Sequence, residues 1–191
     1  MFQESPRVRP APSGWIEVIC GPMFSGKTEE LIRRLTRAKI ARQQLAIFKP
    51  SIDKRYSQLQ IVSHNLREFP SIPVEKPEVI LERSRPAQVV GIDEAQFFDD
   101  SLVEVVVTLA NRGKRVVLSG LDMDFEGRPF GCMPQLMAVA EYVTKIHAVC
   151  VVCGAPATHS FRLNAAQREQ VLIGAGSEYE PRCRHHFSQE Q

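Results

Sequence analysis

The segment GPMFSGKT, residues 21–28, places the strongest constraint on how this chain can fold. It matches the pattern G-x-x-x-x-G-K-[S/T] and follows WIEVIC, residues 15–20, a short apolar run rich in β-branched residues that is typical of a buried strand. After it comes EELIRRLTRAKIARQQ, residues 29–44, in which apolar residues recur at approximately helical spacing. Glycines let such a loop fold around an anion with its N–H groups directed inward. The segment therefore predicts a phosphate-binding loop between a strand and a helix.

Strand-like and helix-like segments alternate along the chain after this loop. Further strands are expected at LAIFKP (45–50), AQVVGIDEA (87–95), KRVVLSGLD (114–122) and near TKIHAVC (144–150), and helices at SLVEVVVTLANRG (101–113) and PQLMAVAEY (134–142). Residues 51–86 hold many of the prolines and are expected to be irregular. The alternation predicts the α/β class, with a parallel sheet of the P-loop NTPase type flanked by helices on both faces.

Charge and hydropathy exclude several kinds of protein. A formal net charge of +2, with basic residues spread along the chain, gives no electrostatic case for a nucleic-acid partner. No stretch approaches about 18 consecutive apolar residues, and the first residues lack an apolar signal core, so no membrane segment or membrane partner is expected. A cytoplasmic location is the default expectation, and close pairs of cysteines fit metal binding in such a reducing compartment.

The segment GIDEAQFF, residues 91–98, places two acidic residues at the end of a predicted buried strand. Asp93 should emerge at the carboxyl edge of the sheet, beside the phosphate loop, where a carboxylate holds Mg²⁺, usually through water, and Thr28 would offer its hydroxyl to the same ion. Lys27 would reach the β- and γ-phosphates of ATP. Glu94 could take a proton from an attacking nucleophile. That nucleophile is water in an ATPase and a substrate hydroxyl in a kinase, and the motif alone does not distinguish them.

Cys150-Val-Val-Cys153 and Cys183-Arg-His-His186 form the pattern C-x₂-C…C-x₂-H. Two close pairs on separate turns can supply four tetrahedral ligands to one Zn²⁺. His186 keeps the symmetric spacing, although His185 is adjacent and could reach the metal instead. Because no carboxylate or base stands beside the pattern, we expect a closed structural zinc site that holds a small lobe with little core of its own.

Two further cysteines lie outside this pattern. Cys20 is expected to pack at the end of the first strand. Cys132 lies in a loop and could be an exposed thiol, and no function follows from its position.

Four parts follow from these patterns. Residues 1–14 contain three prolines and scattered charges and are expected to form a flexible N-terminal tail. The P-loop α/β domain would span 15–148, and a zinc-ribbon-type lobe, called the cysteine lobe below, would span 149–187. The C-terminal tail would be 188–191. The boundary near residue 148 is placed where the alternation ends and the paired cysteines begin.

Three hypotheses fit a phosphate loop combined with a zinc lobe. The box DEAQ also occurs in nucleic-acid helicases, but such a motor needs two ATPase lobes and a basic groove, and this chain has room for one lobe. A regulatory ATPase could use the zinc lobe to bind a partner. A small-molecule kinase needs an acceptor pocket near the γ-phosphate. Phe97, Phe98, Phe125 and Phe130 are suited to stacking a nucleobase near such a site, although each of them alone is better explained by core packing.

Six segments together closely resemble the zinc-containing thymidine kinases found in bacteria and animal cells. In family order they are GPMFSGKTEELIRR, FKPSIDKRY, GIDEAQFF, GLDMDFEGRPFG, AEYVTKIHAVCVVCGAPAT and YEPRCR, and they cover nearly everything from about residue 15 to 187. The resemblance implies transfer of the γ-phosphate of ATP to the 5′-hydroxyl of thymidine, which gives thymidine monophosphate and ADP.

The resemblance also implies a role for each matching residue. The ATP site would comprise Gly21, Pro22, Met23, Phe24, Ser25, Gly26, Lys27, Thr28, Asp53, Arg55, Asp93, Glu94, Ala95 and Gln96. The thymidine site would comprise Phe97, Leu121, Phe125, Phe130, Leu172 and Tyr179. Glu94 would be the catalytic base, and Arg55 would help neutralise charge in the transition state. A loop of the cysteine lobe, roughly residues 161–179, would close over the nucleoside and exclude water.

Two further properties are implied by the resemblance. The family is typically homotetrameric, and thymidine triphosphate, the end product, inhibits it. This chain departs from many members by having His186 where they have a fourth cysteine, and imidazole suits zinc as well.

Overall fold

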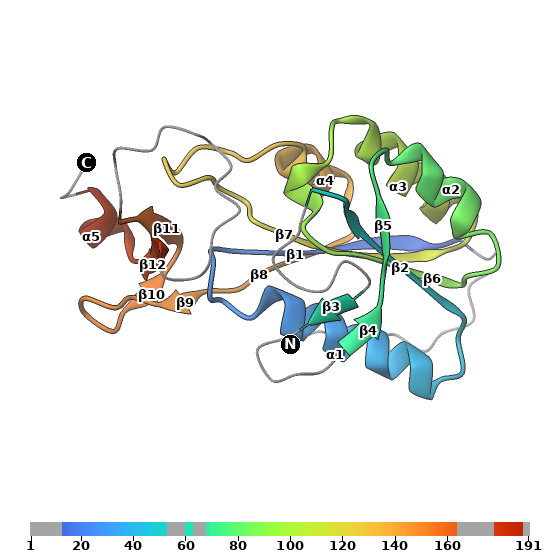
Figure 1. The fold of residues 1–191 in the computed structure, drawn as a ribbon, viewed down its shortest axis with the longest axis horizontal. Coiled ribbons are helices and arrows are strands. Elements are labelled where there is room, and N and C mark those ends of the chain that lie inside the picture. Colours follow the sequence, from blue (N-terminus) through green and yellow to red (C-terminus); the bar gives the residue numbers. More distant parts are fainter. Residues whose placement is uncertain (1–12, 53–59, 63–67, 164–177, 189–191) are drawn as a thin grey trace.

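The computed structural model describes residues 13–52, 60–62, 68–163 and 178–188 of the 191-residue chain. Six parallel strands form its main sheet in the order β5-β2-β6-β7-β1-β8 (Figure 1). Their bounds are β1 Trp15–Cys20, β2 Leu45–Pro50, β5 Ile72–Val74, β6 Val89–Ile92, β7 Arg115–Gly120 and β8 Tyr142–Lys145. The predicted α/β class with a parallel sheet is confirmed.

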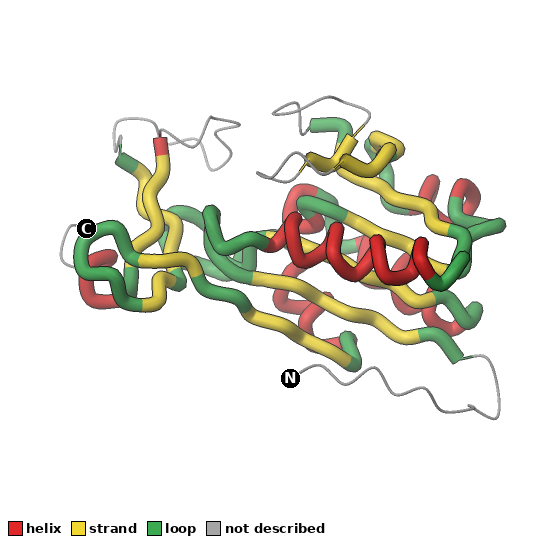
Figure 2. Tube along the Cα trace, turned by 90° about the horizontal axis from the view of Figure 1, so that it is seen from below, coloured by secondary structure: helices red, strands yellow, loops and turns green. Residues whose placement is uncertain are grey.

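Helices cover both faces of this sheet, as the alternation predicted (Figures 1 and 2). Helix α1 packs on one face, and the other three pack on the opposite face. The bounds are α1 Lys27–Ile40, α2 Glu78–Arg83, α3 Ser101–Asn111 and α4 Met133–Val139. Side chains along a strand point alternately to the two faces. In β1, therefore, Ile16 and Val18 join the core under α3 and α4, whereas Ile19 joins the core under α1.

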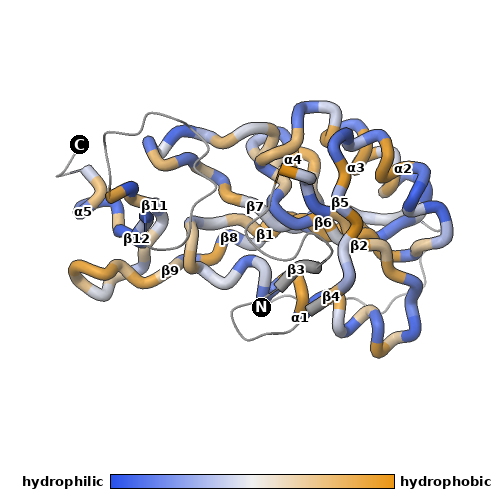
Figure 3. The backbone as a smooth tube through the Cα atoms, in the orientation of Figure 1, coloured by the Kyte–Doolittle hydropathy of each residue, from blue (hydrophilic) through white to orange (hydrophobic). Residues whose placement is uncertain are grey.

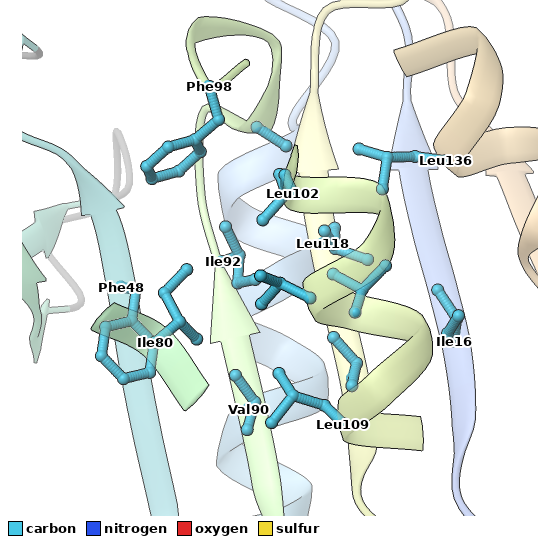
Figure 4. Packing of buried hydrophobic residues seen from close by; sticks show 14 of the residues in the cluster. Ile16, Phe48, Ile80, Val90, Ile92, Phe98, Leu102, Leu109, Leu118 and Leu136 are labelled. Atoms are coloured by element: carbon cyan, nitrogen blue, oxygen red, sulfur yellow. The ribbon is translucent and has the colours of Figure 1, made fainter. Parts of the chain in front are cut away.

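The larger of the two cores shows how the α/β domain is stabilised (Figure 4). Leu102 and Leu109 of α3 pack over Val90 and Ile92 of β6 and over Leu118 of β7, and all five side chains are fully buried. Burial of one such side chain contributes about 1.5–3 kcal/mol relative to leaving it in water. Hydrophobic burial on both faces of the sheet therefore holds this domain together.

The expectation that residues 51–86 are irregular is wrong in three places. Strands β3, Gln60–Val62, and β4, Glu68–Pro70, form an antiparallel pair. Strand β5 adds an edge to the main sheet, and α2 packs against α3. Each of these strands has only three residues, so no periodicity was visible in the sequence, and Pro73 is tolerated because β5 is an edge strand.

The last predicted helix and strand were placed a few residues away from where they lie. Helix α4 begins at Met133 and ends at Val139, so Tyr142 at the end of the predicted helix already belongs to β8. Cys20 ends β1 and is fully buried, as expected.

Beyond β8 the chain forms two small antiparallel sheets and a terminal helix, at the left of Figure 1. The bounds are β9 Ala148–Val149, β10 Pro156–Ala157, β11 His159–Arg162, β12 Tyr179–Arg182 and α5 Arg184–Ser188. Hydrophobic residues at β9 and the turn after it, orange in Figure 3, remain exposed, among them Val149 and Val151. Ala148, Cys150 and Ala157 form a small core cluster with Cys183 packed against it, and Tyr179 and Phe187 are also buried. The domain boundary near residue 148 stays a prediction.

Among the described residues, no helix combines the length and hydrophobicity needed to cross a membrane.

Candidate active site

The phosphate loop connects β1 to α1 and adopts an unusual backbone. Gly21, Phe24 and Gly26 have positive φ angles of 145°, 62° and 84°. A Cβ atom on Gly21 would lie 2.1 Å from the carbonyl oxygen of Ile146, so glycine alone fits there. The Nζ of Lys27 donates a hydrogen bond to the carbonyl oxygen of Pro22 (2.6 Å), which holds the buried ammonium against the loop backbone.

Asp93 follows β6 and lies beside the start of α1. Its Oδ2 accepts a hydrogen bond from Thr28 Oγ1 (3.3 Å), so the two expected Mg²⁺ ligands lie together. Its Oδ1 accepts from the backbone N–H of Glu94 (3.0 Å) and from Ser119 Oγ. Strand β7, which carries Ser119, lies between β6 and β1 in the sheet. Ser119 therefore orients the carboxylate from the intervening strand.

Glu94 has a left-handed backbone (φ 54°) where β6 turns into the short 3₁₀ helix η1, Ala95–Phe97. This conformation costs a non-glycine residue roughly 1–2 kcal/mol, and such strain is concentrated at functional sites. The buried Gln96 side chain donates from Nε2 to Glu94 Oε2 (2.6 Å) and accepts at Oε1 from the Leu121 backbone N–H (3.0 Å). Gln96 therefore fixes the Glu94 carboxylate relative to the residue that follows β7.

Four aromatic side chains expected around thymidine form two groups. Phe97 and Phe130 meet edge to face, with ring centroids 5.8 Å apart. Phe125 and Tyr179 both face the guanidinium of Arg162, whose Cζ lies 3.6 Å and 5.3 Å from the two ring centroids. The first group lies in the α/β domain, whereas the second joins that domain to the cysteine lobe.

A direct hydrogen bond joins the cysteine lobe to the phosphate loop. The backbone N–H of Met23 donates to Ser160 Oγ (3.0 Å), and Ser160 is buried in β11. Two residues further along the same strand lies Arg162. Ser119, Ser160 and Arg162 belong to no motif, so the sequence did not identify them as site residues. The only available signal was their spacing, because residues two apart on a strand, such as Ser160 and Arg162, lie on the same face.

The four expected zinc ligands come together in the cysteine lobe. Their ligand atoms all lie within 4.8 Å of one another. Cys153 Sγ lies 3.8 Å from Cys183 Sγ, and His186 Nδ1 lies 3.8 Å and 3.2 Å from Cys150 Sγ and Cys183 Sγ. Sulfur atoms about 2.3 Å from a tetrahedral Zn²⁺ lie roughly 3.8 Å apart, so these four side chains fit that ion.

The backbone around the first cysteine also suits a metal site. Burial opposes ionisation of the Cys150 thiol, but backbone N–H groups of Cys183, Cys153 and Val152 outweigh it and lower its pKa to about 6. A thiolate is the form of cysteine that binds metal. Between the two adjacent histidines, the structure brings His186 to the cysteines and leaves His185 outside the cluster.

Comparison with known proteins assigns this site to a family. The family model described as "Thymidine kinase" matches residues 14–187. The chain belongs to the thymidine kinase family. Relatives named thymidine kinase come from Rhodothermus sp. (61% identity, covering 91% of this chain and 81% of the relative), Bdellovibrio bacteriovorus (56%, 93% and 87%) and Bacteroides thetaiotaomicron (57%, 90% and 85%).

Some solved structures that match the chain are more distant. They include the Pif1 helicase from Candida albicans (TM-score 0.44, 14% identity, 70% of this chain and 36% of that one). They also include domain III of the Thermotoga maritima replication initiation protein DnaA (TM-score 0.42, 14% identity, 69% and 54%).

Some residues expected in the site are not described by the structure, and one lies elsewhere. Asp53, Arg55 and Leu172 lie outside the described residues. Phe98, considered with Phe97 for base stacking, is instead buried in the main core.

The expectation that Cys132 could be an exposed thiol is wrong. The residue directly precedes α4, is fully buried, and its Sγ lies 3.5 Å from the carbonyl oxygen of Ala95. Burial raises the pKa of this thiol to about 11. The loop that carries Cys132 turns inward to start the helix, and sequence spacing does not reveal that turn.

Proposed function

We propose that this member of the thymidine kinase family transfers the γ-phosphate of ATP to the 5′-hydroxyl of thymidine, giving thymidine monophosphate and ADP. The observation that carries the proposal is the Glu94 carboxylate, which accepts a hydrogen bond from Gln96 and belongs to the residue directly after Asp93, the hydrogen-bond partner of Thr28. A carboxylate at that position can serve as the general base that an alcohol nucleophile requires.

Residues 21–28 would bind the phosphates of ATP through their backbone N–H groups. The Lys27 ammonium, buried against the loop, would balance the negative charge that spreads over the γ-phosphate oxygens in the transition state. Asp53 and Arg55 are proposed near the same phosphates, and Ala95 along the site, from the family resemblance.

Thr28 and Asp93 would hold the Mg²⁺ that accompanies ATP. Thr28 Oγ1 lies 3.3 Å from Asp93 Oδ2, so the hydroxyl and the carboxylate, the latter through water, would both serve one ion. When bound, the ion would supply additional positive charge to the phosphates.

Glu94 would accept the proton of the 5′-hydroxyl. As that oxygen forms a bond to the γ-phosphorus, the bond from the γ-phosphorus to the β–γ bridging oxygen breaks, and ADP leaves with the electron pair. Because Gln96 constrains one carboxylate oxygen, the base would keep its orientation as the proton moves.

The thymidine pocket is proposed to comprise six residues. They are Phe97, Leu121, Phe125, Phe130, Leu172 and Tyr179. Support comes from the two aromatic groups at the carboxyl edge of the sheet and from the contact of the cysteine lobe with the phosphate loop. Excluding water from this pocket would favour transfer to the alcohol over hydrolysis.

We further propose that Cys150, Cys153, Cys183 and His186 bind a structural Zn²⁺. The role is structural because the described residues place no carboxylate in this cluster and because all four positions of a tetrahedral ion are filled by protein. A homotetramer, inhibition by thymidine triphosphate and a cytoplasmic location are proposed on the family resemblance and the cysteine pattern.

The test is ADP release from Mg-ATP by the purified protein, with and without thymidine, with chromatography for thymidine monophosphate. We expect ADP formation to depend on thymidine and to match the monophosphate formed. ADP release that is indifferent to thymidine, with no monophosphate, would instead support the partner-binding ATPase.

A further inference from the structure

Strands β11 and β12 place an arginine opposite a tyrosine of the proposed pocket. The antiparallel register pairs Arg162 with Tyr179, and both residues are buried. Arg162 donates from Nε (3.1 Å) and from Nη2 (2.6 Å) to the Tyr179 hydroxyl oxygen. Two donors of one planar fork therefore hold the tip of the tyrosine ring.

Phe125 approaches the same guanidinium from the α/β domain. Its ring centroid lies only 3.6 Å from the Cζ of Arg162, which is the separation of a stacked cation and ring. The turn that carries Phe125 is itself constrained. Asp124 Oδ1 accepts hydrogen bonds from two backbone N–H groups, two and four residues further along the chain, at 2.9 Å each.

A second buried arginine on the same two strands, Arg182, also packs on an aromatic ring. The Cζ of Arg182 lies 3.7 Å from the Phe161 centroid, and its guanidinium also pairs with Glu180 and donates to the His186 carbonyl oxygen (3.2 Å). All of these contacts lie within the cysteine lobe. Arg162, in contrast, joins a ring of the lobe to a ring of the α/β domain.

We propose that Arg162 is a positioning residue of the thymidine pocket, which holds Phe125 and Tyr179 in one arrangement across the two parts of the chain. The inference rests on the proposed function, which puts both rings around thymine. Arg162 acts through these rings and not on the reacting atoms. A buried cation interacts with a ring more strongly than an exposed one. Lysine, which lacks both the plane and the fork, does not replace it.

The test compares KM and kcat for thymidine and for ATP among three variants. Arg162→Met should raise the thymidine KM about tenfold, equivalent to about 1.4 kcal/mol, with the ATP KM unchanged. Arg162→Lys should resemble the methionine variant. Tyr179→Phe keeps both rings and removes one hydroxyl, so a smaller rise, about threefold, is expected. Zinc content and the thermal midpoint are measured on each variant to establish that it is folded.

Two further variants identify the contact itself. Arg128→Met removes an exposed arginine from the turn that carries Phe125, and it should leave both KM values unchanged. In the Tyr179→Phe background, Arg162→Met should raise the thymidine KM by a smaller factor than in the wild type. The shared hydrogen bonds are already absent there.

Phe125→Ala separates this inference from the pocket assignment on which it rests. If Phe125→Ala raises the thymidine KM but folded Arg162→Met raises neither KM or both equally, the role of Arg162 is overturned and the pocket stands. If Phe125→Ala leaves the thymidine KM unchanged, both are overturned. Wild-type kinetics in Arg162→Lys would refute the claim that the pocket needs the planar guanidinium with its two donors. Should Arg162→Met fail to fold, an unchanged thymidine KM in Tyr179→Phe overturns the inference.

Discussion

The α/β domain and the cysteine lobe are stabilised by different physical means. In the domain, fully buried side chains fill a core on each face of the sheet, such as Leu102 and Leu109 on one face and Leu35 on the other. In the lobe, Ala148, Cys150 and Ala157 form a small cluster, and Tyr179 and Phe187 are also buried. Regularly spaced apolar residues stabilise the large domain by their burial, whereas the short lobe depends on a few specific side chains.

The same two regions divide the proposed site between them. The domain supplies the phosphate loop, the Asp93–Thr28 pair and Glu94, and the lobe adds Ser160 against the loop and Tyr179 beside Phe125. Loss of the lobe should therefore remove nucleoside binding while leaving a folded phosphate site.

The largest effect is expected from removing a zinc ligand. His186→Ala should abolish zinc binding and unfold the cysteine lobe, because structural zinc contributes roughly 10–16 kcal/mol to folding in small metal-dependent units. Metal analysis and amide hydrogen exchange check this, with protection retained in the α/β domain. His185→Ala is the matched control and should keep one zinc per chain. An ordered lobe in a metal-free His186→Ala protein would show that the lobe does not depend on zinc for its folding.

Removing the proposed base, Glu94, should slow phosphate transfer without unfolding the cysteine lobe. Glu94→Gln is expected to lower kcat about 10²–10⁴-fold, the usual contribution of a positioned general base. Steady-state kinetics and zinc analysis should show an unchanged ATP KM and full metal content. Glu126→Gln, at an exposed carboxylate, is the control. Near-normal turnover in Glu94→Gln would remove this residue as the base.

A cavity in the main core should destabilise the domain while the lobe keeps its metal. Leu109→Ala is expected to lower the free energy of unfolding by about 2–5 kcal/mol. Trp15, the chain's single tryptophan, lies in β1 and reports unfolding of the domain by fluorescence during denaturant titration. Zinc should stay bound under native conditions. Metal loss from Leu109→Ala without denaturant would mean that the two regions are not stabilised separately.

The smallest effect is expected from changing Gln96, which orients the proposed base Glu94. Gln96→Met removes the hydrogen bond to Glu94 and leaves the Leu121 N–H buried without its acceptor, which should lower the free energy of unfolding by about 1–3 kcal/mol. Turnover should fall less than in Glu94→Gln, because the carboxylate is still present but has lost the hydrogen bond that orients it. Gln135→Met, exposed on α4, is the control. Wild-type turnover in a folded Gln96→Met protein would indicate that Gln96 is only a packing residue.

The sequence by itself determined the parallel sheet, the phosphate loop and the acidic box. Each depends on a local pattern: apolar runs of strand length, glycines at fixed spacing, or acidic residues directly after a buried strand. The cysteine pattern likewise identified the three cysteines that meet in the lobe, because the spacing within each half of the pattern is short.

Only the tertiary structure decided which distant groups meet. It selected His186 over His185, buried Cys132, and added the three-residue strands β3, β4 and β5. It also brought Ser160 to Met23 and Arg162 to Phe125, over sequence separations that no motif spans. Such contacts depend on strand order and on the packing of the lobe against the phosphate loop, and these emerge only when the whole chain is folded.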